Sequence, residues 1–143
     1  MSLLPLERAL DANLIPLVYG DVAFDTVRGG TIISTETVFT YLAQNLPVTQ
    51  ILLLGEVDGV YDLEQKVIPH ITPSNYPAIK PALKGSGGVD VTGGMLTKVE
   101  DMLSLVEEKP YLSIRIFNGQ TPGLLQQALM DQPILSTLIS QKS

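Results

Sequence analysis

Apolar residues along the chain follow two kinds of spacing, helical and continuous. Helical spacing, with a capping residue or a glycine at three of the starts, predicts helices over residues 4–13, 35–45, 94–108 and 123–130. Continuous apolar runs bounded by turn residues predict strands over residues 15–19, 49–55, 112–117 and 134–139. Strands that alternate with helices are typical of an α/β fold with a mostly parallel sheet and flanking helices.

Four stretches refine this prediction. Residues 22–33 hold two β-prone pieces around Arg28-Gly29-Gly30, which predicts a hairpin with its turn at the glycines. Residues 51–54 are all apolar, as in a parallel strand covered on both faces. Residues 62–88 contain four prolines and a glycine-rich tract, which predict irregular structure. The helix over 94–108 is expected to turn Glu100 toward water and to bury Met95, Val99, Met102, Leu103 and Val106.

Composition limits the classes of protein that this chain can belong to. Its 143 residues fit one domain, and a hydrophobic fraction of 45% argues against a disordered tail. Nine Lys and Arg against 15 Asp and Glu give a net charge of −6, which argues against a nucleic-acid partner. There is no cysteine, and no apolar run reaches the ~18 residues of a membrane span. We therefore expect a cytoplasmic protein that binds neither nucleic acid nor membrane.

A first candidate site opens the helix over 94–108. Gly93 and Gly94 expose backbone N–H groups at a helix start, where the partial positive charge suits a phosphate. Lys98, one turn further on, can reach the same anion. Asp90 and Thr92 can cap the helix or hold a hydrated Mg²⁺ ion. An ordinary capped helix with a surface lysine explains the same residues, and their spacing alone does not decide between the two.

A second candidate site follows the strand over 49–55. Ligands of open α/β sheets bind beyond the carboxyl ends of the strands, so this loop suits a nucleotide. Here Tyr61 offers a flat face to a base, Asp58 can accept hydrogen bonds or face a metal, and Glu56 adds a carboxylate. The alternative is a plain strand-exit turn with Gly59 at positive φ.

Three further features have simple explanations. Gly20-Asp21 follows an apolar run and is explained by a turn. Ser34-Thr35, followed by Glu36, is explained by a helix cap with an acidic first turn. The single histidine, His70, has no second histidine or cysteine to help it bind a metal. It is expected on the surface or in packing, and no metal site made of protein ligands alone is predicted.

Taken together, four segments resemble the amino acid kinase family, in particular its isopentenyl phosphate kinase branch. In order, they are PLVYGDVAFDTVRGGTIIS, VDGVYD, DVTGGM followed by Lys98, and IFNG. The resemblance runs from about Ile15 to the C-terminus and covers the second, nucleotide-binding half of the family's fold. It departs from the family at Glu56, where an aspartate is usual, and at Thr35-Glu36, where Gly-Asp is usual.

The resemblance implies a role for each candidate residue. ATP, with Mg²⁺ on its phosphates, would be held by Glu56, Asp58, Tyr61, Asp90, Thr92, Gly93, Gly94 and Lys98. A small-molecule phosphate acceptor would be bordered by Gly20, Ser34 and Thr35. Lys98 and Asp21 would be the catalytic residues, with Lys98 stabilising charge as the γ-phosphoryl group moves.

The resemblance further implies that this chain is a fragment of a larger kinase. The family's glycine-rich N-terminal strand with its lysine, its other glycine-rich loops and its histidine have no match here. We therefore expect little or no kinase activity from this chain alone, and a strand edge covered by the missing half or by a second copy. Other acceptors (a phosphonate, an amino acid or a nucleoside monophosphate) and a non-catalytic nucleotide-sensing module are the alternatives.

Overall fold

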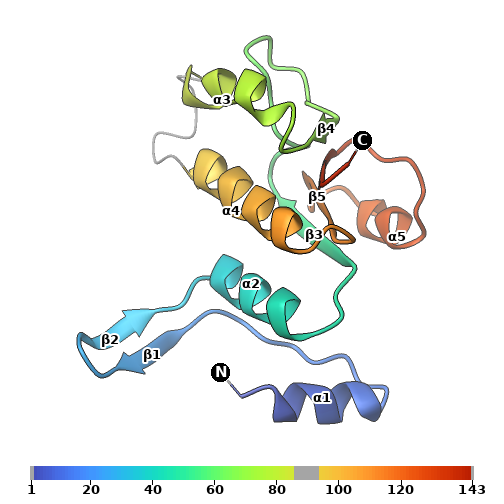
Figure 1. The fold of residues 1–143 in the computed structure, drawn as a ribbon. Coiled ribbons are helices and arrows are strands. Elements are labelled where there is room, and N and C mark those ends of the chain that lie inside the picture. The colour runs from blue at the N-terminus through green and yellow to red at the C-terminus, as the bar shows by residue number, and fades with distance from the viewer. Residues whose placement is uncertain (1, 86–93, 143) are drawn as a thin grey trace. The chain divides into compact units, whose positions relative to one another are not determined.

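The computed structural model describes residues 2–85 and 94–142, and the chain divides into two compact units. Unit 1 is Met1–Tyr41 and unit 2 is Leu42–Ser143. Figure 1 shows their elements in chain order. Among the described residues, no helix combines the length and the apolar character needed to cross a bilayer.

Unit 1 contains the helix and the hairpin predicted at the start of the chain. Helix α1 spans Leu4–Asp11 and has proline in its first turn, where the missing N–H removes no helical hydrogen bond. Strand β1 (Val22–Asp25) pairs antiparallel with β2 (Gly29–Ile32). Helix α2 (Thr35–Asn45) begins in this unit and ends in unit 2.

The hairpin turn is built by the carboxylate of Asp25. Its Oδ1 accepts hydrogen bonds from the backbone N–H groups of Arg28 at 2.7 Å and Val27 at 2.8 Å. These two bonds hold the pKa of Asp25 below its ordinary value. Gly29 follows with a φ of 79°, a conformation that suits glycine. The turn therefore lies at residues 26–28, slightly before the predicted place, and Gly29 and Gly30 belong to β2.

The apolar run over residues 15–19 is not a strand, so this prediction is wrong. The run is irregular, and the side chain of Ile15 is 97% exposed. A strand requires a hydrogen-bonded neighbour, and no described strand pairs with this run. Apolar composition therefore indicated a tendency to be buried, but it could not indicate a partner.

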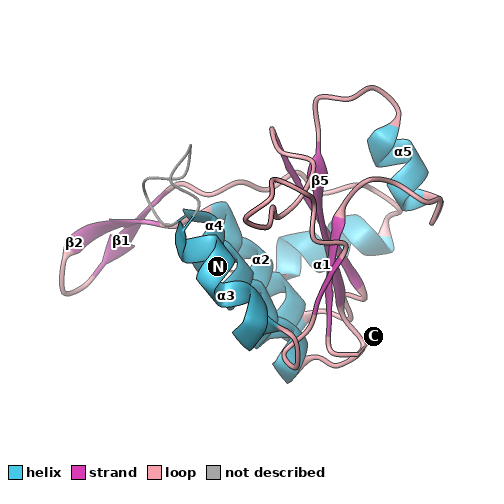
Figure 2. Ribbon diagram, turned by 90° about the horizontal axis from the view of Figure 1, so that it is seen from above, coloured by secondary structure: helices cyan, strands magenta, loops and turns pink. Residues whose placement is uncertain are grey.

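Unit 2 is a layered α/β structure around a four-stranded sheet. Its strands are β3 (Gln50–Gly55), β4 (His70–Ile71), β5 (Ser113–Asn118) and β6 (Thr137–Ser140), in the order β3-β5-β6-β4. β3 is parallel to β5 and β4 to β6, whereas β5 and β6 are antiparallel. The helices are α3 (Tyr76–Gly85), α4 (Gly94–Glu108) and α5 (Leu124–Leu129). Figure 2 shows α3 and α4 on one side of the sheet and α5 on the other.

The core of unit 2 lies between α4 and the central strands. The helix buries most of the predicted stripe and Leu105 in addition, whereas Met95 is only half-buried. On the strands, Ile114, Phe117 and Ile139 are fully buried. The prediction that β3 is covered on both faces is wrong at Leu54, which is 44% exposed. β3 is the edge strand of the described sheet, so its side chains have a neighbouring strand, with its side chains, on one side only.

Two expectations about the proline-rich stretch and the next helix are corrected. Residues 76–85 form α3 even though Pro77 and Pro81 lie in it. Pro77 sits in the first turn, where proline is tolerated, and Pro81 is accommodated inside the helix. Glu100 does not simply face water, because its carboxylate binds two side chains of α3.

Candidate functional site

The loop after β3 folds back on itself as a tight hairpin. Ile68 N–H donates to the Val60 carbonyl at 2.7 Å, and Asp62 N–H donates to the Lys66 carbonyl at 2.9 Å. The sequence favours this turn because Asp62 Oδ1 accepts the N–H groups of Glu64 and Lys66, at 2.8 and 2.9 Å. The segment VDGVYD is therefore held in a defined conformation.

Thr137, at the start of β6, anchors this hairpin to the sheet. Its buried hydroxyl accepts the N–H of Val60 at 2.8 Å and donates to the Ile68 carbonyl at 2.7 Å. A Cβ added at Gly59 would lie 2.7 Å from both Thr137 Oγ1 and Val67 Cγ1. Gly59 does not have positive φ, so that expectation is wrong. The glycine instead permits the close approach of the threonine.

Asp58 is positioned by Asn118, a residue that the sequence analysis did not select for the site. Asn118 Nδ2 donates to Asp58 Oδ1 at 3.2 Å and lies 3.4 Å from the Glu56 carbonyl oxygen. The Tyr61 hydroxyl donates to Asp58 Oδ2 at 3.3 Å. The Asn118 amide is itself oriented, because its Oδ1 accepts the N–H of Gln120 at 2.8 Å. Both oxygens of Asp58 are therefore bound by neighbouring side chains.

The predicted parallel sheet could have pointed to Asn118, because residues that end neighbouring parallel strands lie close together. Gly55 is opposite Asn118 in the β3–β5 register, so the residues after the two strands meet at one edge of the sheet. Glu56, in contrast, is exposed, and it is its backbone carbonyl that faces Asn118. Tyr61 is half-buried beside Asp58.

The start of α4 lies toward the same edge of the sheet. Residues 109–112 connect the end of α4 directly to the beginning of β5, so helix and strand run in opposite directions (Figure 1). Gly94 therefore lies toward the end of β5, and Lys98, half-buried, follows one turn later. The predicted site residues Asp90, Thr92 and Gly93 lie outside the described residues.

A separate group of predicted residues comes together within unit 1. A Cβ on Gly20 would lie 3.0 Å from the carbonyl carbon of Ser34 and 3.1 Å from the backbone nitrogen of Thr35. The Asp21 carbonyl accepts the N–H of Ile33 at 2.9 Å, and its Oδ1 accepts the N–H of Val22 at 2.7 Å. The glycine thus lets two backbone segments touch at the base of the hairpin.

Ser34 and Thr35 have the positions expected for a helix start. Ser34 Oγ accepts the N–H of Thr37 at 3.1 Å, which is the hydrogen bond of an N-cap. Thr35 is the first residue of α2 and is exposed.

In unit 2, His70 Nε2 lies 2.8 Å from Ser140 Oγ. This contact joins neighbouring strands and fits the packing role expected for the histidine.

Comparison with known proteins identifies a family and several similar enzymes. The family model described as amino acid kinase family matches residues 2–118. An isopentenyl phosphate kinase of Methanocaldococcus jannaschii is 34% identical over 127 residues, which cover 89% of this chain and 46% of that protein. An isopentenyl phosphate kinase of Haloferax volcanii is 38% identical over 99 residues, covering 69% of this chain and 39% of that protein.

Solved structures agree on the fold. An X-ray structure of isopentenyl phosphate kinase has a TM-score of 0.73 at 23% identity, over 96% of this chain and 50% of that one. The UMP kinase of Ureaplasma parvum has a TM-score of 0.60 at 19% identity, over 99% of this chain and 53% of that one. The chain spans about half the length of the curated relatives it matches. It belongs to the amino acid kinase family.

Proposed function

We propose that this chain is the ATP-binding part of a kinase that transfers the γ-phosphoryl group to a phosphate acceptor such as isopentenyl phosphate. The main support is the Asn118–Asp58 hydrogen bond at 3.2 Å. This bond holds the loop after β3 close to the C-terminal end of β5. The first turn of α4 lies toward the same end of the sheet. Ligands of parallel α/β sheets bind at such edges.

The proposed nucleotide site provides charge of both signs. Phosphoryl transfer depends on positioning and charge neutralisation more than on covalent chemistry. The N–H groups at the start of α4 and the Lys98 ammonium supply positive charge to the phosphates. Mg²⁺ is usually bound through one or two carboxylates together with the substrate's phosphates. Asp58, and Asp90 outside the described residues, are the carboxylates proposed for it, while Tyr61 borders the nucleoside.

Unit 1 is proposed to provide part of the acceptor site. Gly20, Asp21, Ser34 and Thr35 meet at the base of the β1–β2 hairpin, with Asp21 proposed near the reacting group. Val22 is opposite Ile32 in the hairpin, and Phe24 lies on the same face. All three side chains are largely exposed. An apolar surface next to this group supports an acceptor with an apolar tail, as in isopentenyl phosphate, over an amino acid.

Titration of Mg-ATP into the 143-residue chain tests the nucleotide site. We expect weak binding, and we expect Lys98→Ala to weaken it about tenfold, or ~1.4 kcal/mol. Lys66→Ala is the matched control, because Lys66 is exposed in the loop and pairs only at the surface with Glu64. Absence of ATP binding by the unmodified chain, with and without Mg²⁺, would contradict the proposal.

Activity is proposed to need more chain than is present here. The unmodified chain is expected to show little or no phosphorylation of isopentenyl phosphate. Turnover should appear after addition of the part of the Methanocaldococcus jannaschii relative that this chain does not match. Acetylglutamate and UMP, offered to the same mixture, distinguish the alternative acceptors. Binding of ATP without any turnover in the mixture would favour a nucleotide-sensing module.

The proposed partner is a protein surface that covers the open edge of β3. Among the described strands this one pairs only with β5, and Leu54 near its end is 44% exposed. A flat, apolar strand edge readily pairs with another chain. We propose that the remaining half of the kinase or a second copy of this chain fills that position. A monomer at high concentration in sedimentation experiments would contradict self-association.

A further inference from the structure

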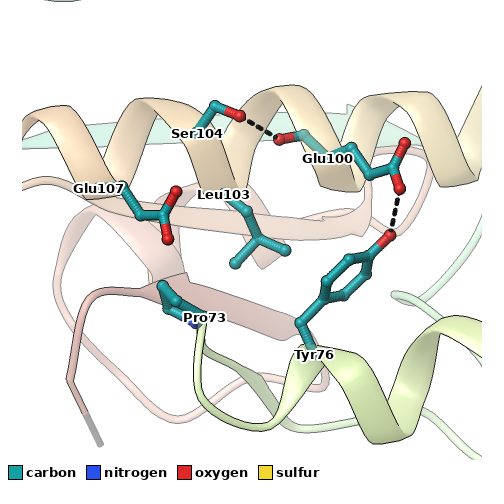
Figure 3. A pocket seen from close by; sticks show the side chains of 6 residues that line it. All are labelled: Pro73, Tyr76, Glu100, Leu103, Ser104 and Glu107. Carbon is teal, nitrogen blue, oxygen red and sulfur yellow. Dashed lines mark hydrogen bonds between the residues drawn. The ribbon is translucent and has the colours of Figure 1, made fainter.

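Three side chains outside the proposed nucleotide site join α3 to α4. The Tyr76 hydroxyl donates to Glu100 Oε1 at 2.7 Å, and Lys80 Nζ lies 2.7 Å from the same oxygen. Lys80 Nζ also lies 5.7 Å from the centroid of the Tyr76 ring, within the range of a cation–π contact. Figure 3 shows Tyr76 reaching from α3 to Glu100 on α4. We call Tyr76, Lys80 and Glu100 the α3–α4 clasp.

The surroundings of the clasp strengthen it relative to an ordinary surface ion pair. It borders a pocket of about 290 Å³ that also involves Pro73, Leu103, Ser104 and Glu107 (Figure 3). The Lys80 and Glu100 side chains are 41% and 38% exposed, whereas both members of the Lys66–Glu64 pair are 73% exposed. A lower local dielectric constant increases the attraction between charges. Burial and the bond to Glu100 raise the pKa of Tyr76, so its hydroxyl remains a donor even at the alkaline pH at which an ordinary tyrosine ionises.

Helix α3 needs this attachment because its own hydrogen bonding is incomplete. Pro81 lies inside the helix and has no N–H to donate to the carbonyl four residues earlier. A helix of 10 residues is marginal by itself even without proline. Lys80 directly precedes Pro81, so its ion pair with Glu100 ties the weakened turn of α3 to α4.

The clasp holds α4 close to its N-terminal end. Glu100 follows Lys98 by two positions, and side chains two positions apart point to different sides of a helix. The clasp therefore holds one side of α4 while Lys98 projects from another. Since the helix backbone is continuous, restraining its rotation at Glu100 also restrains Gly94 and Lys98.

We propose that Glu100, held by Tyr76 and Lys80, is a positioning residue for nucleotide binding. It sets the direction of the first turns of α4, and with them the Gly94 N–H and the Lys98 ammonium that face the phosphates. This inference rests on the proposed function. It predicts that losing the clasp weakens binding of the triphosphate more than binding of AMP, which has no β- or γ-phosphate.

The test compares Mg-ATP and AMP affinities of the 143-residue chain and its variants, together with hydrogen exchange at residues 95–98. Glu100→Ala should weaken Mg-ATP binding about tenfold, leave AMP binding nearly unchanged and speed amide exchange. Glu100→Gln keeps an acceptor for Tyr76 and should recover part of the affinity. Glu107→Gln is the matched control, because Glu107 lines the same pocket two turns further along α4.

The outcomes separate this inference from the function on which it rests. If the unmodified chain binds no nucleotide, the proposed function fails. If the chain binds Mg-ATP and Glu100→Ala binds it equally well, the positioning role is overturned. An equal loss of ATP and AMP affinity would indicate a structural role only, and would also overturn it. Should Glu100→Ala not fold, Tyr76→Phe, which retains the ring and removes one bond, decides in the same way.

Discussion

The two units differ in how far they bury a phenylalanine side chain, as Phe117 and Phe24 show. Phe117, on β5 of unit 2, is fully buried, whereas Phe24, on β1 of unit 1, is 101% exposed. Unit 2 places helices on both faces of a four-stranded sheet, and these helices cover its apolar residues. Unit 1 has only a two-stranded sheet among its described strands, and such hairpins are marginal by themselves.

Unit 2 therefore has its own core, whereas unit 1 leaves Val22, Phe24 and Ile32 of its hairpin largely exposed. The exposed face of the hairpin is continuous, because Val22, Phe24 and Ile32 lie on one side of it. Large exposed apolar patches usually mark binding surfaces. This agrees with the proposal that unit 1 provides part of the acceptor site.

The largest expected effect tests this contrast directly, with matched phenylalanine substitutions. Phe117→Ala should lower the free energy of unfolding by about 3–5 kcal/mol, because it opens a cavity in a packed core. Phe24→Ala should change it by less than about 0.5 kcal/mol, since the ring is already in water. Urea denaturation measures both. A comparable loss for Phe24→Ala would mean that the hairpin face is covered in the isolated chain.

A second, smaller effect compares glycines of the two units. Gly59→Ala should destabilise the fold by about 1–3 kcal/mol, because its Cβ would lie 2.7 Å from Thr137 Oγ1 and from Val67 Cγ1. Gly30→Ala in the hairpin is the control, since its Cβ would meet nothing closer than the Ala23 carbonyl oxygen at 3.9 Å. Thermal unfolding followed by circular dichroism compares the two. Equal melting temperatures would show that the hairpin after β3 relaxes around the methyl group.

The smallest effect concerns pH and the turn of the unit 1 hairpin. The N–H groups of Arg28 and Val27 lower the pKa of Asp25 in the folded state, below the 3.8 of an ordinary aspartate. Stabilisation from a lowered carboxyl pKa is present above pH ~4 and is lost as the pH falls through the folded pKa. The amide NMR signals of Val27 and Arg28 should therefore shift on acidification below pH ~4. Asp25→Asn should abolish that dependence, and persistence of the shifts in this variant would contradict the assignment to Asp25.

Much of the order of elements could be predicted from local pattern. The stripe of α4, the hairpin and the Ser34 cap of α2 were recognisable because they depend on residues only a few positions apart. The prediction missed α3, because two prolines argue against a helix unless neighbouring structure supports it. It also placed a strand over residues 15–19, because apolar spacing does not reveal whether a strand has a neighbour.

For the candidate site, too, some features could be predicted from local sequence and others could not. Local sequence was enough to place Asp58 and Tyr61 after a predicted strand and Lys98 near the start of a predicted helix. The packing of distant segments, in contrast, brings Asn118 to Asp58, 60 residues away, and brings Thr137 to Val60, 77 residues away, where it holds the hairpin after β3. Likewise, the packing of α3 against α4 brings Glu100 into contact with Tyr76 and Lys80. Local pattern sets which side chains lie at the end of an element, but contacts between distant residues depend on how the strands pair and the helices pack.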